Sequence, residues 1–163
     1  MATLARLWFA LPPEDGREPS GTLADLSRRP LAALLHALDA ASVQLARTLA
    51  RGSELRPLAV SEPLPEALDR LAAEHADREF ALVAPLQVLV PTLARALDLA
   101  PAEAVRLQPR PGSLCAFHWP TGSDPLARPE LIGLDLDWFP PWHPGQPRPR
   151  FPGGPGVAGS PRR

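Results

Sequence analysis

The chain has 163 residues, a formal net charge of −1 and a single cysteine. This length supports one domain with a real core and is too short for two domains of ordinary size. The near-neutral charge argues against a general nucleic-acid-binding protein, because phosphate contacts need a basic surface. Cys115 alone excludes an internal disulfide, which fits a reducing compartment.

The charge is divided unevenly along the chain. Residues 1–138 hold 13 arginines and all 18 acidic residues, whereas residues 139–163 hold four arginines, no acidic residue and many prolines and glycines. We therefore predict a single α/β domain over residues 1–138 and a disordered Pro/Gly/Arg-rich tail over residues 139–163, since the tail cannot bury enough apolar surface to offset its ordering entropy. Trp142 and Phe151 are candidate docking residues in the tail, and a plain tail is the alternative.

Charged residues appear early in the chain, at Arg6 and again at Glu14. No uncharged hydrophobic run is long enough for a signal peptide or a membrane span. We therefore expect a cytoplasmic protein that binds neither membrane nor nucleic acid.

The first half of the chain predicts two strands and three longer helices. Residues 4–11 contain a continuous apolar run, which is typical of a strand covered on both faces, and Pro12 ends it. Leucines recur at helical spacing after Pro30, a residue that a first helical turn tolerates. The other elements are helices over residues 42–51 and 66–75 and an edge strand over residues 55–60, beside the helix over residues 30–38.

Residues 79–99 form the motif around which the predicted fold is organised. A buried strand over residues 80–84 leads through a short turn into a helix that begins near Val88, with Leu97 on its apolar side. In open α/β sheets such turns lie at the carboxyl edge, where ligands bind. A short helix over residues 101–105 and strands over residues 113–119 and 130–137 follow. The pattern predicts a three-layer α/β sandwich with a mostly parallel sheet, whose last two strands are a hairpin-like addition.

Several segments carry a resemblance to a known family. They are the first strand Leu7-Trp8-Phe9-Ala10, the helix entry at residues 23–29, the helix at residues 67–75, the strand, turn and helix of residues 79–99, and the strands within residues 106–119 and 131–138. Together these segments resemble the histidine phosphatase superfamily, the phosphoglycerate-mutase-like group, over most of residues 4–138. The resemblance implies a reduced phosphoglycerate-mutase-like fold.

The resemblance also implies where an active site would lie, and there the chain departs from the family. The family's first strand ends in Arg-His-Gly-Glu and its central strand is followed by Ser-His-Gly or a similar turn. The corresponding positions here are Leu11, Pro12, Pro13 and Glu14, and then Ala84, Pro85 and Leu86. Arg47 is a candidate for the second phosphate-binding arginine. The segment that supplies the family's acid is shortened, which leaves Glu62 or Glu66 as its candidate.

These departures predict a degenerate member that lacks both catalytic histidines. A phosphohistidine intermediate needs an imidazole nitrogen as nucleophile and cations around the phosphoryl oxygens. Proline supplies no ring nucleophile and no backbone N–H donor. We therefore expect no histidine-phosphatase activity and assign no catalytic residue.

The histidines, the Asp135/Asp137 pair and Cys115 are expected to have structural rather than catalytic or metal-binding roles. The four histidines show no metal-ligand spacing, so we expect neither a metal nor a cofactor. Asp135 and Asp137 lie two apart on a predicted strand and so share one side, where a solvated strand face is favoured over an acid or metal pair. Cys115 lies in an apolar strand and is expected to be a buried small residue.

Two classes of function remain open. The first, which we favour, is an inactive phosphatase-like protein that serves as a protein-binding module or an assembly subunit. It predicts an exposed apolar patch near the former pocket, formed by Leu11, Pro12, Pro13, Pro85 and Leu86, or use of the tail. The second is an enzyme or small-ligand binder with a rebuilt site drawn from Glu14, Arg17, Arg47, Asp135 and Asp137.

Overall fold

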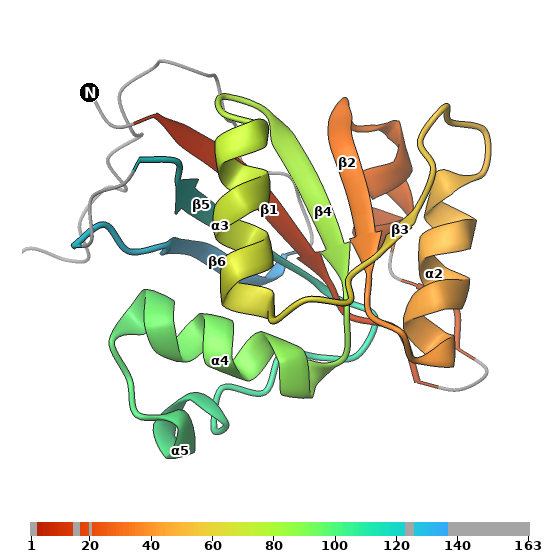
Figure 1. Cartoon of the computed structure of the whole chain (residues 1–163). Coiled ribbons are helices and arrows are strands. Elements are labelled where there is room, and N and C mark those ends of the chain that lie inside the picture. The colour runs from red at the N-terminus through yellow and green to blue at the C-terminus, as the bar shows by residue number, and fades with distance from the viewer. Residues whose placement is uncertain (1–2, 15–16, 20, 123–125, 137–163) are drawn as a thin grey trace, which may run out of the picture.

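The computed structural model describes residues 3–14, 17–19, 21–122 and 126–136. A six-stranded sheet in the order β3-β2-β4-β1-β5-β6 forms its centre (Figure 1). The strands are β1 Leu4–Ala10, β2 Leu31–His36, β3 Leu58–Ala59, β4 Glu79–Val83, β5 Leu114–Pro120 and β6 Glu130–Leu136. The first four are parallel to their neighbours among themselves, and β5 and β6 add two antiparallel pairings. The predicted mixed, mostly parallel sheet is confirmed.

The continuous apolar runs of β1 and β4 place these strands at the centre of the sheet. Every residue from Glu79 to Val83 is buried, and β1 is buried from its second residue onward. Successive side chains of a strand point to opposite faces, so an unbroken apolar run fits only a strand that is covered on both sides. The strands predicted at residues 4–11 and 80–84 are therefore confirmed.

The helix predicted over residues 30–38 is wrong, because residues Leu31–His36 form strand β2. This strand lies between β3 and β4, with Leu35 opposite both Leu58 and Leu82. The leucine spacing fitted a helix, but a short apolar run is compatible with the period of a helix and with that of a strand. Here the segment pairs with β3 on one side and β4 on the other, which makes it a strand. Leu38, which the helix would have buried, is 68% exposed.

Helices cover both faces of the sheet and complete the predicted three layers. On the front face in Figure 1 lie α3 Leu64–Glu74, α4 Leu86–Leu97 and α5 Pro101–Ala104. On the back face lie α1 Gly21–Asp25, the 3-10 helix η1 Leu26–Arg28 and α2 Ala40–Ala50. Asp39 caps α2 by accepting a hydrogen bond from the Ser42 N–H. Among the described residues, no helix is long and apolar enough to cross a membrane.

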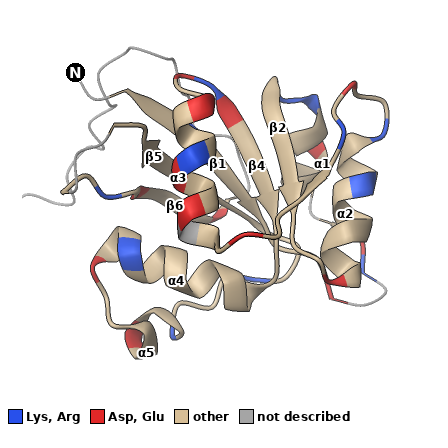
Figure 2. Cartoon of the chain, viewed as in Figure 1, with Lys and Arg blue, Asp and Glu red and all other residues tan. Residues whose placement is uncertain are grey.

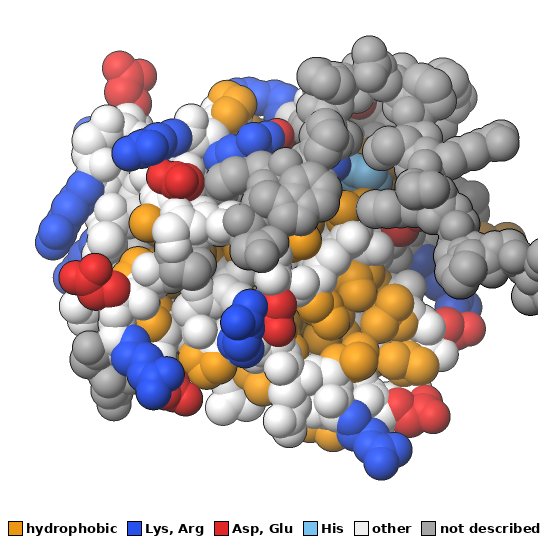
Figure 3. All heavy atoms as spheres, turned by 180° about the vertical axis from the view of Figure 1, so that it is seen from behind, with side chains coloured by type: hydrophobic (Ala, Val, Ile, Leu, Met, Phe, Trp, Pro, Cys, Tyr) orange, Lys and Arg blue, Asp and Glu red, His pale blue; other side chains and the backbone are white. Residues whose placement is uncertain are grey.

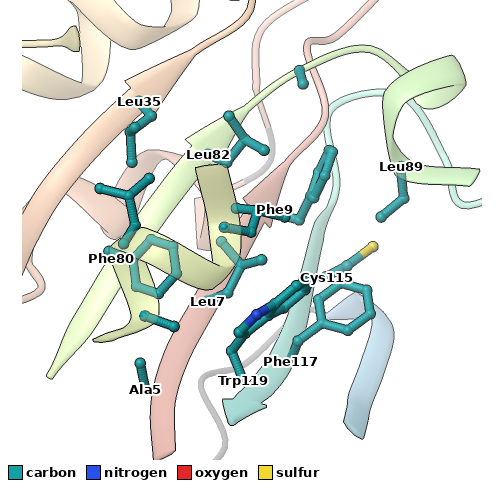
Figure 4. Packing of buried hydrophobic residues seen from close by; sticks show 14 of the residues in the cluster. Ala5, Leu7, Phe9, Leu35, Phe80, Leu82, Leu89, Cys115, Phe117 and Trp119 are labelled. Atoms are coloured by element: carbon teal, nitrogen blue, oxygen red, sulfur yellow. The ribbon is translucent and has the colours of Figure 1, made fainter. Parts of the chain in front are cut away.

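The core has two halves separated by the sheet. The front cluster lies under α3, α4 and α5 and includes Leu7, Phe9, Phe80, Leu89, Phe117 and Trp119 (Figure 4). The back cluster includes Trp8, Leu23, Leu26, Leu34, Leu45 and Ala116. Alternate residues of β1 enter each cluster, so one strand holds both halves together. Leu97, predicted on the buried side of α4, is instead 37% exposed.

The antiparallel addition is irregular at the outer strand β6. Two register shifts interrupt the pairing of β5 with β6, and Asp135 adopts a positive φ of 49°. The regular alternation predicted for residues 130–137 is therefore broken near its end. Asp137 lies outside the described residues, so its predicted pairing with Asp135 stays a prediction.

A cluster of charged and aromatic side chains lies on the back face where β1 and β4 begin. We call it the buried charge cluster, and it comprises Arg6, Trp8, Arg29, Glu79 and His118. The Trp8 indole N–H donates to Glu79 Oε2 at 2.9 Å, and the Arg29 guanidinium donates to both carboxylate oxygens of Glu79. Arg6 Nη2 donates to His118 Nε2 at 2.9 Å. One carboxylate thus ties three segments of the chain together.

Burial in this cluster lowers the pKa of the Arg6 guanidinium. Arg6 is 1% exposed, and burial lowers the pKa of its guanidinium to about 10, an effect that the charge of Glu79 opposes. The guanidinium carbons of Arg6 and Arg29 lie 5.2 and 5.3 Å from the ring centre of Trp8. Cation–π contacts and the Glu79 carboxylate therefore compensate the desolvation of two cations.

Replacing Glu79 with Gln tests this compensation. The variant keeps the side-chain shape but leaves the Arg6 and Arg29 charges without the carboxylate, so we expect a loss of about 3 kcal/mol in the free energy of unfolding. Urea unfolding followed by circular dichroism measures the change. Glu62→Gln is the matched control, because Glu62 is an exposed carboxylate paired with Arg70, and it should leave the midpoint unchanged. An equal effect of both variants would contradict the compensation.

Candidate active-site edge

The ends of β1 and β4 place the two predicted catalytic turns side by side. Ala10 is opposite Val83 in the parallel pairing, and the Ala84 N–H donates to the Ala10 carbonyl at 3.2 Å. The residues that follow each strand therefore leave the sheet at the same carboxyl edge. Figure 2 shows that β4 has no charged residue between its middle and this edge. We call this place the candidate edge.

The turn after β1 is apolar and held by backbone hydrogen bonds. Leu11 is buried and belongs to the front cluster, while Pro12 and Pro13 are half-buried. The Gly112 N–H donates to the carbonyls of Leu11 and Pro12 at 3.1 and 3.2 Å. The loop that precedes β5 therefore holds this turn in place through backbone hydrogen bonds.

The turn after β4 is equally apolar. Ala84 is fully buried, and the partly buried Leu86 packs against the front cluster. Pro85 stands immediately before α4 and has no N–H to offer a ligand, and its carbonyl accepts the Val88 N–H at 3.0 Å. The start of α4 therefore follows a proline and lies beside the apolar side chains of Ala84 and Leu86.

The predicted charged residues Glu14, Arg17, Arg47 and Glu62 are exposed. Glu14 is exposed and pairs with the exposed Arg17 at 3.5 Å. Arg47 is exposed in the last turn of α2. Helix α2 begins just after β2, at the candidate edge, and runs away from that edge. Arg47 is seven residues from the start of the helix, which at 1.5 Å per residue is roughly 10 Å along its axis. Glu62 is engaged with Arg70 on the surface.

Asp135 has a structural role at the same end of the sheet. Its Oδ1 accepts hydrogen bonds from the Arg110 N–H at 2.6 Å and from the Ser113 hydroxyl at 2.9 Å. These contacts tie β6 to the loop that contains Gly112. The carboxylate is thereby occupied in holding the loop, and it is not joined to Glu14 or Arg17.

Sequence reasoning missed one titratable side chain at the candidate edge. His36 is the last residue of β2, half-buried, and its Nδ1 lies 2.9 Å from the Ala37 carbonyl oxygen. A carbonyl only accepts hydrogen bonds, so Nδ1 is the donor in this contact. The prediction of a helix concealed this position, whereas a strand prediction would have placed the imidazole at the end where ligands bind.

Nucleophile and metal chemistry find little support in the described part of the chain. Cys115 is fully buried in the front cluster, and burial raises the pKa of its thiol to about 12, so the thiol stays protonated and unreactive near neutral pH. The prediction of a buried small residue is confirmed. No group of three or more histidine, cysteine or acidic side chains capable of holding a metal ion occurs among the described residues.

The contact of Gly112 with the first turn is testable by substitution. Gly112 has a φ of +77°, and an added Cβ would lie 3.3 Å from the Pro13 Cβ. We expect Gly112→Ala to lower the free energy of unfolding by about 2 kcal/mol, from left-handed backbone strain plus crowding. Gly52→Ala is the control, because Gly52 has a φ of +78° with open space around it, and should cost about 1 kcal/mol. Equal losses of unfolding free energy for the two variants, measured by urea unfolding, would mean that Pro13 moves away from the added Cβ without cost.

Comparison with solved structures finds proteins of the same fold at low sequence identity. YhfR of Bacillus stearothermophilus has a TM-score of 0.56 and 11% identity, over 69% of this chain and 90% of that chain. The α-ribazole phosphatase of Shigella flexneri has a TM-score of 0.55 and 12% identity, over 80% and 96%. Mycobacterial hydrolase 2 has a TM-score of 0.56 and 13% identity, over 82% and 91%. No protein-family model and no curated sequence matches the chain. The chain therefore has the phosphoglycerate-mutase-like α/β fold that it shares with these proteins.

Proposed function

We propose that this protein keeps a phosphatase fold without histidine chemistry and serves as a protein-binding module or an assembly subunit. The observation that carries the proposal is the juxtaposition of Pro12 and Pro13 with Pro85 at one carboxyl edge, where β1 and β4 end together. In a phosphohistidine enzyme this edge must hold the nucleophile and the phosphate-binding groups. Here apolar side chains occupy both turns.

The packing of the two turns supports the loss of the chemistry. Leu11 is 3% exposed and Ala84 is fully buried, so the backbone next to the prolines is part of the core. A phosphoryl group placed there would lose its hydration without gaining the cationic hydrogen-bond donors that compensate for it. Loss of a nucleophile that acts as part of a unit costs on the order of 10⁶ in rate.

An exposed apolar surface supports the binding role. Large hydrophobic side chains remain exposed on α4 and just after α5, at Leu97 (37%) and Val105 (50%). In Figure 3 hydrophobic side chains gather on the side of the molecule where Figure 1 places β6, α4 and α5. Apolar surface of this kind with charged neighbours such as Asp98 and Arg128 is typical of protein interaction sites. We call it the α4–α5 patch.

The α4–α5 patch is tested by co-purification from the native host followed by mass spectrometry. We expect a partner in stoichiometric amount with the wild-type chain and its loss with Val105→Asp, because a buried carboxylate in an apolar interface is costly. The control is Leu38→Asp, since Leu38 is 68% exposed at another corner of the sheet. A partner that survives Val105→Asp would place the interface elsewhere, and a retained small molecule instead of a protein would support a ligand-binding function.

His36 favours a second candidate, a phosphatase-fold enzyme or small-ligand binder with a rebuilt site. Its imidazole stands at the candidate edge with Nδ1 engaged by the Ala37 carbonyl, and hydrolases are among the proteins of similar fold. A neutral imidazole in this position can act as a general base.

Assays with p-nitrophenyl phosphate separate the two candidates. We expect no turnover by the purified 163-residue chain above the rate in buffer, because both turns lack a nucleophile. His36→Ala is compared with His75→Ala, a half-buried histidine at the end of α3. Turnover that His36→Ala abolishes and His75→Ala retains would overturn the first candidate in favour of the second.

A further inference from the structure

A group of exposed arginines lies on the β3 side of the molecule. Arg47, Arg51 and Arg56 form no ion pair with any residue that the structure describes. Exposed arginines elsewhere do have carboxylate partners, as Arg28 has in Asp25. Cations that the fold leaves without a carboxylate are available to a ligand from outside the chain.

The local structure gathers these arginines at one corner. Arg47 is in the last turn of α2 and Arg51 ends that helix four residues later, so both lie on one side of it. The N–H and the hydroxyl of Ser53 donate to the Ala50 carbonyl at 3.1 and 3.0 Å, which folds the chain back before it reaches Arg56. Figure 2 shows basic residues on α2 and on the segment that leads from α2 to β3.

An apolar side chain lies in the same segment as Arg56. Leu58 follows it by two residues, belongs to the border strand β3 and is 55% exposed. Leu55 fixes the segment in place, because it packs against the back cluster. We call the following four residues the basic corner: Arg47, Arg51, Arg56 and Leu58.

We propose that the basic corner binds an acidic segment of a partner protein, with carboxylates on the arginines and an apolar side chain on Leu58. Residues 40–60 hold three arginines and one acidic residue, Glu54, whereas residues 1–138 hold 13 arginines and 18 acidic residues. The basic corner is thus a positive site on a negative domain, which orients an approaching acidic partner. Arginine suits this partner because its planar guanidinium forms paired hydrogen bonds with a carboxylate.

Helix stabilisation accounts for only part of the basic corner. Cations near the C-terminus of a helix interact favourably with its dipole, which is equivalent to about half a negative charge there. Arg47 and Arg51 are placed for this interaction. Arg56 lies beyond the loop that follows the helix, and the exposure of Leu58 has no such role. Positive charge and apolar surface therefore remain for a partner.

Two other occupants fit the basic corner less well. A nucleic acid presents an extended row of phosphates, which the acidic residues of the rest of the domain repel. The predicted tail over residues 139–163 lies outside the described residues, and it holds four arginines and no acidic side chain. A separate acidic protein is the occupant that the charges favour.

The basic corner is separate from the α4–α5 patch. It lies at the β3 border of the sheet, whereas α4 packs on β6 at the opposite border. The two surfaces can therefore be tested independently, and the failure of one leaves the other unaffected.

Fluorescence anisotropy with a labelled acidic peptide tests the basic corner. The probe is a fluorescein-labelled peptide of repeated Glu-Glu-Leu triplets, and its control has Gln in place of every Glu. We expect the 163-residue chain to bind the Glu peptide and not the Gln peptide. Arg51→Gln/Arg56→Gln should weaken this binding about tenfold through the loss of two surface ion pairs.

A matched double variant controls for net charge. Arg106→Gln/Arg110→Gln removes the same charge from two exposed arginines between α5 and β5, and should change the affinity less than about twofold because salt screens distant charges. Leu58→Ser keeps every charge and should weaken binding about fivefold through lost apolar contact.

Four outcomes would overturn the proposal. Equal binding of the Glu and Gln peptides would show no preference for carboxylates, and equal weakening in the two double variants would show that only net charge matters. A single-stranded DNA oligonucleotide that binds more tightly than the peptide, and through Arg51 and Arg56, would assign the basic corner to nucleic acid. Val105→Asp should leave peptide binding unchanged, and a loss of binding there would move the peptide to the α4–α5 patch.

Discussion

The fold depends on one buried carboxylate, that of Glu79 at the start of the central strand. It accepts hydrogen bonds from Trp8 on β1 and from Arg29 just before β2, so it bridges the beginnings of three parallel strands. A slip of one residue in β4 would turn the carboxylate to the other face and leave Trp8 and Arg29 without it. Hydrophobic runs alone would tolerate more than one register, and we infer that this contact selects one.

The candidate edge lies at the opposite ends of the strands that contact Glu79. The strands that Glu79 aligns at their start finish together at Ala10 and Val83, so the two proline turns meet. The buried charge cluster lies at the end away from the edge where α/β proteins bind ligands. Apolar side chains occupy the two turns at that edge, and this contrast with the charged far end underlies the proposal of a binding role.

Secondary structure could be predicted from the sequence where the apolar pattern fits only a helix or only a strand. The buried strand β4 and the helices α2 and α3 were all predicted, because burial and period agree in each. The prediction failed at residues 31–36, where leucine spacing suits two structures and only pairing with β3 and β4 decides. The contacts of Glu79 with Trp8 and of Arg6 with His118 join residues 71 and 112 positions apart, and no local pattern predicts them.

The irregular strand β6 has a consequence for how the protein meets other chains. An incoming strand needs a regular row of amide and carbonyl groups, and the register shifts of β6 and the left-handed Asp135 disturb that row. At the opposite border, β3 spans two residues and follows Pro57, which has no amide hydrogen. Neither border is a good template for sheet growth, so native molecules resist stacking into fibrils, and self-association through strands would have to start from unfolded chains.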